Sequence, residues 1–255
     1  MDAHILLGAL VIGAGVGFLS GAFGKGGSAV STPLLHALGV PAIVAIASPL
    51  PATIPSTLLA SRGYARAGHV DRTVLKVGLI VGLPLTAIGA FLTRWIGGEP
   101  LVLATDVILL VLGLRVLLTA RVEPDAVGDS AVDLPLVSRG RTVGVVAVAA
   151  LVSGLLGNSG GFLLAPLFMN VLHMPVRRAL GTSLALAAAL AVPGTIVHAW
   201  LGHIDWSLAL VFGLASVPLA TVGATVALRV REHSLSLAYG FGIALLSGGL
   251  LIFAR

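Results

Sequence analysis

The sequence predicts an all-α polytopic membrane protein made of two inverted repeats, each with about five apolar segments. Three observations lead to this fold class. Of the 255 residues, 57% are hydrophobic and only 10% are charged, and the mean hydropathy is +1.08. An ordinary soluble domain has about 25% charged residues, so too little polar surface exists here for a water-facing exterior. Apolar runs of membrane-spanning length recur along the chain, and its two halves resemble each other.

Apolar segments divide the chain into two membrane repeats and a linker. We assign residues 1–120 to the first repeat, 121–141 to a cytoplasmic linker rich in acidic residues, and 142–255 to the second repeat. The first run lacks the basic start of a signal peptide, so we expect it to belong to the mature structure. In order, the segments are Ile5–Gly24, Gly26–Ser61, Thr73–Thr93, Leu101–Ala120, Thr142–Val176, Ala179–Ile204, Trp206–Leu228 and Ser234–Ala254.

The second half of the chain repeats the first. Ser20–Gly27 aligns with Ser153–Gly160, and after one inserted residue Gly68–Asp71 aligns with Gly202–Asp205. Apolar low complexity also produces local matches, but it does not keep one register along a whole half. We therefore interpret the two halves as a duplication. Further matching pairs are Pro33 and Pro166, Pro41 and Pro175, Pro84 and Pro218, and Gly89 and Gly223.

Basic residues gather at four places, which give a consistent topology if all four lie in the cytoplasm. The loops at Arg94–Glu99 and His203–Asp205 and both chain ends then lie outside. Equivalent loops face opposite sides of the membrane, since Gly68–Asp71 is inside and Gly202–Asp205 is outside. Inverted repeats of this kind are typical of secondary transporters. The basic residues expected in the cytoplasm are Arg62, Arg66, Arg72, Lys76, Arg115, Arg121, Arg139, Arg141, Arg177, Arg178, Arg229 and Arg231.

Each half opens with an apolar helix that ends at a glycine cluster, Gly24–Ser28 or Gly157–Gly161. Glycine at this density does not favour a continuous helix, and broken backbone at membrane depth must be buried or line a wet cavity. We expect a helix, a break, and a short or re-entrant half-helix that returns to the starting side. Its N-terminus would direct free N–H groups and the positive end of the helix dipole at the break. Two such ends predict an anion site.

Polar side chains at the breaks add to this predicted site. Lys25 brings a full positive charge, and a charge at membrane depth is by default a functional candidate. The alternative is that Lys25 extends to the cytoplasmic interface, and the alternative role for the glycines is close helix packing. Asn158 and the hydroxyls of Ser28 and Ser159 supply hydrogen-bond donors.

A second group of polar residues follows each predicted hairpin. The stretch from Ser48 to Thr57 contains prolines and small hydroxyl side chains, and its partner in the second half is Gly181–Ser183. Such hydroxyls can donate to an anion, or they can bond back to carbonyls that proline leaves free. Both interpretations stay open at this point.

These motifs resemble those of the TauE/SafE family, also called the toluene-sulfonate uptake permease family. The resemblance covers nearly the whole chain, although Ala47-Ser48-Pro49 departs from the family's second motif. It implies transport, often export, of sulfite, sulfonates and related organosulfur anions across a bacterial inner membrane. The similar segments are Gly24–Ser28 with Pro33, Gly157–Gly161 with Pro166, and Ala179–Ser183.

The sequence thus predicts a secondary transporter that exports small sulfur-containing anions by alternating access, without a catalytic residue or cofactor. Its expected partners are the anion, the lipid bilayer and a coupling ion, proton or sodium, and not nucleic acid. Alternatives are a passive anion channel and an intramembrane serine hydrolase, with Ser159 as nucleophile and His198 or His203 as base. The predicted substrate-binding residues are Gly24, Lys25, Gly26, Gly27, Ser28, Ser48, Thr53, Asn158, Ser159, Gly160, Gly161, Thr182 and Ser183.

Metal chemistry finds little support in the sequence. The chain has no cysteine, which excludes disulfides, Fe–S clusters and cysteine-ligated zinc. His69-Val70-Asp71 and His203-Ile204-Asp205 have metal-ligand spacing, but we expect loop and helix-cap roles for both and no metal site. Asp106 and His198 are expected near the membrane interfaces, with a proton-coupling role as the alternative for Asp106.

Overall fold

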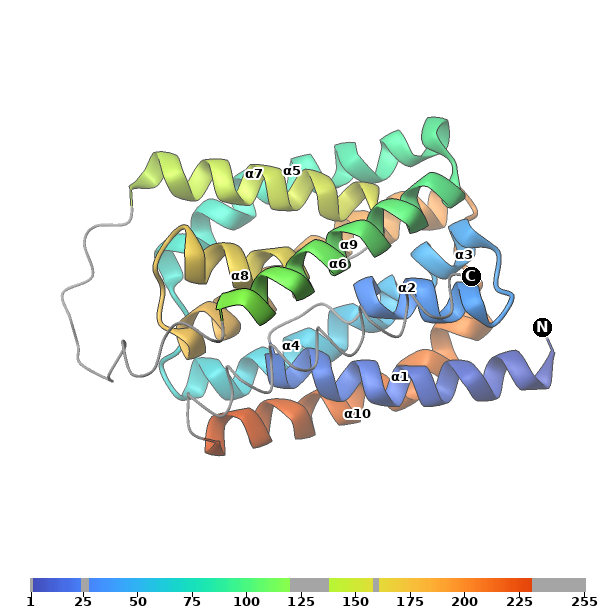
Figure 1. Cartoon of the computed structure of the whole chain (residues 1–255), viewed down its shortest axis with the longest axis horizontal. Coiled ribbons are helices and arrows are strands. Elements are labelled where there is room, and N and C mark those ends of the chain that lie inside the picture. Colours follow the sequence, from blue (N-terminus) through green and yellow to red (C-terminus); the bar gives the residue numbers. More distant parts are fainter. Residues whose placement is uncertain (1, 24–27, 120–137, 158–160, 231–255) are drawn as a thin grey trace.

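The computed structural model describes residues 2–23, 28–119, 138–157 and 161–230, and within these ranges it contains helices and no strands (Figure 1). The all-α class is therefore confirmed. Most of the predicted linker and the segment Ser234–Ala254 lie outside the described residues. The helices are α1 (Ala3–Phe23), α2 (Ser28–Ala37), α3 (Ala42–Ala47), α4 (Leu50–Arg66), α5 (Arg72–Ile96), α6 (Gly98–Thr119), α7 (Arg139–Leu155), α8 (Gly161–Asn170), α9 (Val176–Trp200) and α10 (Trp206–Arg229).

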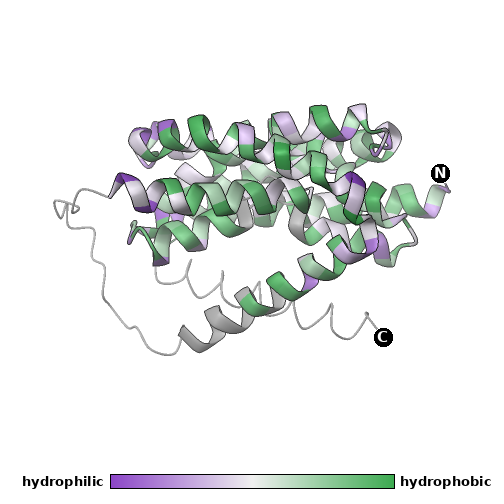
Figure 2. Cartoon of the chain, turned by 90° about the horizontal axis from the view of Figure 1, so that it is seen from above, coloured by the Kyte–Doolittle hydropathy of each residue, from purple (hydrophilic) through white to green (hydrophobic). Residues whose placement is uncertain are grey.

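The surface of the bundle is that of an integral membrane protein. Large apolar side chains point outward along its middle; Ile80, for example, is 76% exposed and Leu214 is 66% exposed. Figure 2 shows apolar residues along the helices and hydrophilic residues mainly at their ends. Among the described residues, the helical segments long and apolar enough to cross a membrane are Ala3–Phe23, Ala42–Arg66, Arg72–Ile96, Val176–Trp200 and Trp206–Arg229.

The short helices α2 and α8 each return toward the side from which the preceding long helix started. Leu35 near the end of α2 shares a buried cluster with Ala9 near the start of α1. Phe168 of α8 is buried with Val146 in the first half of α7. Both short helices have 10 residues, which is about 15 Å of helix and half of a bilayer core about 30 Å thick. The pairs α1–α2 and α7–α8 are therefore two hairpins whose second helix is only half as long as a membrane span.

Each hairpin's long helix packs on a helix of the other half, α1 on α10 and α7 on α5 (Figure 1). Glycine allows the backbones to touch: a Cβ at Gly21 would strike the Ala220 carbonyl, and a Cβ at Gly154 would strike the Thr86 carbonyl. These are equivalent positions of the two predicted repeats. The same small-residue packing joins both helix pairs in a crossed arrangement.

The helix ends that carry the predicted cytoplasmic basic residues lie together at one end of the bundle. In Figure 1 this is the left end, where α4 and α10 stop and α5, α7 and α9 start. Asp71 contacts the first turns of α9, whereas Asp205 follows the last turn of α9. The two equivalent loops are therefore separated by the length of that helix. This arrangement supports the inverted-repeat interpretation.

Candidate functional site

The two hairpin tips are the predicted anion site, and the structure describes their walls. The first tip lies between Phe23 and Ser28, and the second between Gly157 and Gly161. Ser28 and Gly161 are the first residues of α2 and α8, so their backbone N–H groups belong to the unpaired first turn of a helix. The predicted site residues at the tips that lie outside the described residues are Gly24, Lys25, Gly26, Gly27, Asn158, Ser159 and Gly160.

The described residues that precede the two tips lie beside the second polar motif of the opposite repeat. Gly157 follows the end of α7 with a φ of +57°, and a Cβ there would meet the side chain and carbonyl of Ile46, two residues before Ser48. Phe23, at the end of α1, shares a buried cluster with Leu180, which directly precedes the Gly181–Ser183 motif. The fold thus brings the described residue before each glycine break, Phe23 or Gly157, close to one hydroxyl motif of the other half.

Phe23, the described residue before the first tip, also lies close to the second hairpin. Phe23 and Ala165 of α8 belong to one buried cluster, together with residues of α4, α9 and α10. Leu163 of α8 packs against the cluster that contains Ile46 and Leu156. The first turns of α8 therefore lie between the end of α1 and the end of α3. A ligand at the tips would be enclosed by elements of both halves.

The four described hydroxyl candidates all bond to the backbone. Ser48 Oγ accepts from the N–H of Asp205 at 3.0 Å, and Thr182 Oγ1 accepts from the N–H of Asp71 at 2.9 Å. These two are equivalent bonds between the halves. Thr53 Oγ1 donates to the Pro49 carbonyl at 3.1 Å, and Ser183 Oγ donates to the Leu180 carbonyl at 2.9 Å. All four residues are buried.

The predicted cap roles of the two aspartates are confirmed. The Asp71 carboxylate accepts from the N–H groups of Thr73 and Val74, and the Asp205 carboxylate accepts from that of Leu208. Asp71 also forms an ion pair of 3.1 Å with Arg178, a contact that sequence reasoning missed.

Sequence reasoning also missed Tyr64. This side chain of α4 is fully buried, and its hydroxyl donates a hydrogen bond of 3.3 Å to the Ala22 carbonyl in the last turn of α1. Because the last carbonyls of a helix have no partner within it, Tyr64 stabilises the end of α1 next to the first tip. The available signal was that Tyr64, one of only two tyrosines in the chain, lies beside the basic residues Arg62 and Arg66.

Polar groups elsewhere in the described ranges do not gather into a metal site. Among the described residues, no three histidine or acidic side chains gather as metal ligands would. His36 lies 3.5 Å from Glu99, and Asp106 of α6 has one buried carboxylate oxygen without a partner in the described region. The Asp106 carboxyl group is therefore more enclosed than we expected for a residue near a membrane interface.

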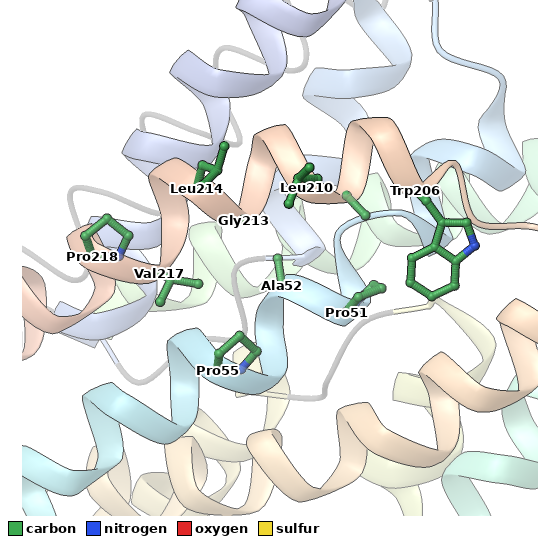
Figure 3. Close-up of a pocket in the computed structure, with 10 residues that line it drawn as sticks. Pro51, Ala52, Pro55, Trp206, Leu210, Gly213, Leu214, Val217 and Pro218 are labelled. Atoms are coloured by element: carbon green, nitrogen blue, oxygen red, sulfur yellow. The ribbon is translucent and has the colours of Figure 1, made fainter.

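A groove of about 660 Å³ lies between α4 and α10, as Figure 3 shows. Trp206 lies at one end of it and Pro218 at the other, with Pro51 and Pro55 on the facing helix. No charged or hydroxyl side chain lines it. An apolar groove of this kind does not compensate the charge of an anion, so it is not the candidate site.

Comparisons with known proteins agree with a membrane transporter. The family model described as "Sulfite exporter TauE/SafE" matches residues 9–251. A "Probable membrane transporter protein" of Xylella fastidiosa (strain 9a5c) is 29% identical over 240 residues, which cover 91% of this chain and 90% of that protein. The "Probable membrane transporter protein YunE" of Bacillus subtilis (strain 168) is 25% identical over 245 residues, covering 88% and 87%. No solved structure matches the chain.

Proposed function

The chain belongs to the TauE/SafE family, and on that premise we propose that it exports small sulfur-containing anions, such as sulfite or sulfonates, as a secondary transporter. It is an integral membrane transporter. The anion binds between the two glycine-rich tips and crosses the membrane by alternating access. The membrane is the bacterial plasma (inner) membrane, with the basic end of the bundle in the cytoplasm.

The observation that carries this proposal is the pair of re-entrant hairpins. A half-helix that starts about halfway through the membrane presents several unpaired N–H groups and the positive end of its dipole to the tip. The start of α2 and the start of α8 both do so. Backbone N–H groups suit a sulfur oxyanion because its oxygens are acceptors only, and they stabilise a negative charge without a titratable partner.

Side chains at the tips complete the proposed site. Lys25 and Asn158 would compensate the charge and donate hydrogen bonds, and Ser28 and Ser159 would add hydroxyl donors. Ser48 and Thr182 already accept hydrogen bonds from backbone N–H groups, so their own hydroxyl hydrogens are oriented by that contact. Each is proposed to donate from the wall beside the opposite tip.

The crossed packing supports alternating access between two repeats, residues 1–120 and 142–255. Gly89 packs against the carbonyl of Leu151 and the N–H of Leu155, and Gly223 packs against the carbonyl of Phe18 and the N–H of Ala22. These are equivalent contacts in the two halves. If the repeats are related by an axis in the membrane plane, exchanging their conformations opens the tips to the other side.

Reconstitution into liposomes tests the proposal. The purified chain is screened for uptake of labelled sulfite, sulfate, thiosulfate, sulfoacetate, taurine and simple carboxylates, with protein-free liposomes as control. We expect saturable uptake of at least one sulfur anion, accelerated by the same anion inside the vesicle. Uptake that is accelerated by anion on the opposite side of the membrane is a property of carriers. Uptake without this acceleration would indicate a channel. Absence of uptake for every sulfur anion would contradict the proposed substrate class.

A further inference from the structure

We propose that the transport defined above is driven by protons, and that His198 and His203 form the proton-binding site, whose protonation opens the outer end of the bundle. This inference rests on the proposed function. It concerns a pair of histidine side chains that are not among the groups proposed to bind the anion.

The two imidazole rings are held together across the α9–α10 loop. His198 is in the last turn of α9 and is fully buried, whereas His203 in the loop is half-buried. Their Nδ1 atoms are 3.1 Å apart and their ring centroids 5.3 Å apart. At this distance one Nδ1 must donate and the other must accept. The pair therefore shares one hydrogen when neutral, and it can bind one further proton.

The pair connects outer water with the interior of the bundle. His203 is reachable from the loop, while the Nε2 of His198 is buried and has no hydrogen-bond partner among the described residues. The backbone of Gly154, in the last turn of α7, faces the His198 ring. Since α7 leads directly into Gly157 and the second tip, a proton on this pair lies next to the wall of the proposed anion site.

No negatively charged side chain of a described residue pairs with either ring in this arrangement. Asp205 is occupied at the cap of α10, and Arg94 of α5 lies over Phe91 and Trp95. Within the described part of the chain, no carboxylate forms an ion pair with either ring. Burial lowers the pKa of His203 below its usual value. The closed arrangement therefore favours the neutral pair.

Protonation and opening are linked for this reason. The loop is held closed by a buried cluster of Ala47, Ile204 and Ala209 and by the Asp205–Ser48 hydrogen bond. Because His203 directly precedes Ile204, an added proton places a positive charge beside this cluster, and separating the loop from α3 and α4 returns that charge to water. Acid outside thus favours the open form, and because the closed form disfavours the charged ring, the change occurs at a pH below the ordinary histidine pKa of about 6.5. When the outer end of the bundle closes again, the histidine pair is buried, its charged form is disfavoured, and the proton is released toward the interior.

In the part of the chain that the structure describes, such a histidine pair is found at one end of the bundle. The positions equivalent to His198 and His203 in the first repeat are Tyr64 and His69. Tyr64 bonds to the Ala22 carbonyl and has no ring contact with His69 in the structure. A proton gradient has a direction. An exporter driven by this gradient is therefore consistent with a proton-binding histidine at one end of the bundle and with Tyr64 at the equivalent position of the other end.

The transport experiment compares His198→Gln and His203→Asn with the matched control His69→Asn. Proteoliposomes with a pH-sensitive dye inside receive thiosulfate or sulfoacetate, both fully ionised between about pH 5.5 and pH 8. In the wild type we expect anion movement to carry protons, and a pH gradient to drive accumulation. Both His198→Gln and His203→Asn should lose at least about tenfold of the gradient-driven accumulation. Proton movement as in the wild type in His198→Gln, or equal loss in His69→Asn, would overturn the proposal.

A second measurement does not depend on transport. Because the chain contains no cysteine, a single Ala47→Cys or Ala209→Cys reports whether the cluster opens to a membrane-impermeant thiol reagent. The labelling rate is divided by that of Glu99→Cys, whose side chain is 75% exposed, which cancels the pH dependence of the thiol. The ratio should rise several-fold as the pH falls below about 6.5 and stay flat in the His198→Gln background. A flat ratio in the otherwise unmodified chain would overturn the proton site, whereas absence of anion transport alone would overturn only the proposed function.

Discussion

Thr182 Oγ1 accepts a hydrogen bond of 2.9 Å from the backbone N–H of Asp71, the residue that caps the start of α5. At the other end of the bundle, Ser48 Oγ accepts the equivalent bond of 3.0 Å from Asp205, the cap of α10. Each bond joins one half of the chain to the other. The sequence predicted that these two hydroxyls bind the substrate. In the structure each accepts a hydrogen bond that joins the two halves of the chain.

Thr182→Val should destabilise the protein. The substitution keeps the shape of the side chain but leaves the partly buried N–H of Asp71 without its acceptor, which costs about 1–3 kcal/mol. Thermal unfolding in detergent should show a Tm lower by about 2–4 °C per kcal/mol. Thr225→Val is the matched control, because Thr225 is exposed and bonds only to the Thr221 carbonyl of its own helix. Equal Tm values for both variants would contradict the role of the inter-half bond.

Gly21→Ala should weaken the contact between α1 and α10. A Cβ at Gly21 meets the Ala220 backbone, which cannot move aside as a flexible side chain can. The expected cost is about 1–3 kcal/mol. Gly15→Ala on the same helix is the control: nothing lies within 4 Å of its Cβ, and alanine favours the helix by up to about 1 kcal/mol. The two variants should therefore differ in sign in a denaturation experiment.

Lys25→Ala should weaken anion binding several-fold or more, because a full positive charge near the tip is removed. The measurement is the concentration dependence of anion uptake or of direct binding. Lys76, the second lysine of the chain, is exposed on α5 and serves as the control. Lys76→Ala should keep the wild-type affinity. Wild-type affinity in Lys25→Ala would remove this residue from the proposed site.

The Asp71–Arg178 ion pair should contribute little to stability. The two side chains are 14% and 39% exposed, and pairs this accessible to solvent are worth less than about 1 kcal/mol. Arg178→Ala should therefore cost less than Asp71→Ala, which also removes a helix cap worth about 1 kcal/mol. Asp205→Ala removes an equivalent cap without an arginine partner. A double-mutant cycle on Asp71 and Arg178 measures the coupling, and a value far above 1 kcal/mol would refute the small contribution.

The inverted topology can be tested with two equivalent, exposed positions, Thr73 at the start of α5 and Ser207 at the start of α10. In intact cells, a membrane-impermeant thiol reagent should label Ser207→Cys and leave Thr73→Cys unlabelled until the cells are opened. Labelling of both variants from outside would contradict the inversion. The cysteine-free background of the chain makes each result unambiguous.

Local chemistry and pattern were sufficient for much of this protein. The scarcity of charge indicates a bilayer environment, the clusters Gly24–Ser28 and Gly157–Gly161 separate α1 from α2 and α7 from α8, and Asp71 and Asp205 cap the helices that follow them. Repetition of Gly68–Asp71 as Gly202–Asp205 revealed the duplication. Each of these properties depends on residues close together in the sequence, so it can be recognised without coordinates.

Only the tertiary structure decided which distant groups meet. Crossing of α1 on α10 and α7 on α5 brings Thr182 to Asp71, Tyr64 to Ala22, and the second tip to Ile46. The close approach of the two imidazoles likewise depends on how the loop folds back onto the last turn of α9. Such contacts arise from packing between surfaces that are all apolar, where hydrophobic periodicity no longer tells one partner helix from another. The sequence by itself therefore determined the environment, the repeats and the helix breaks, whereas steric fit between small residues decided the partners.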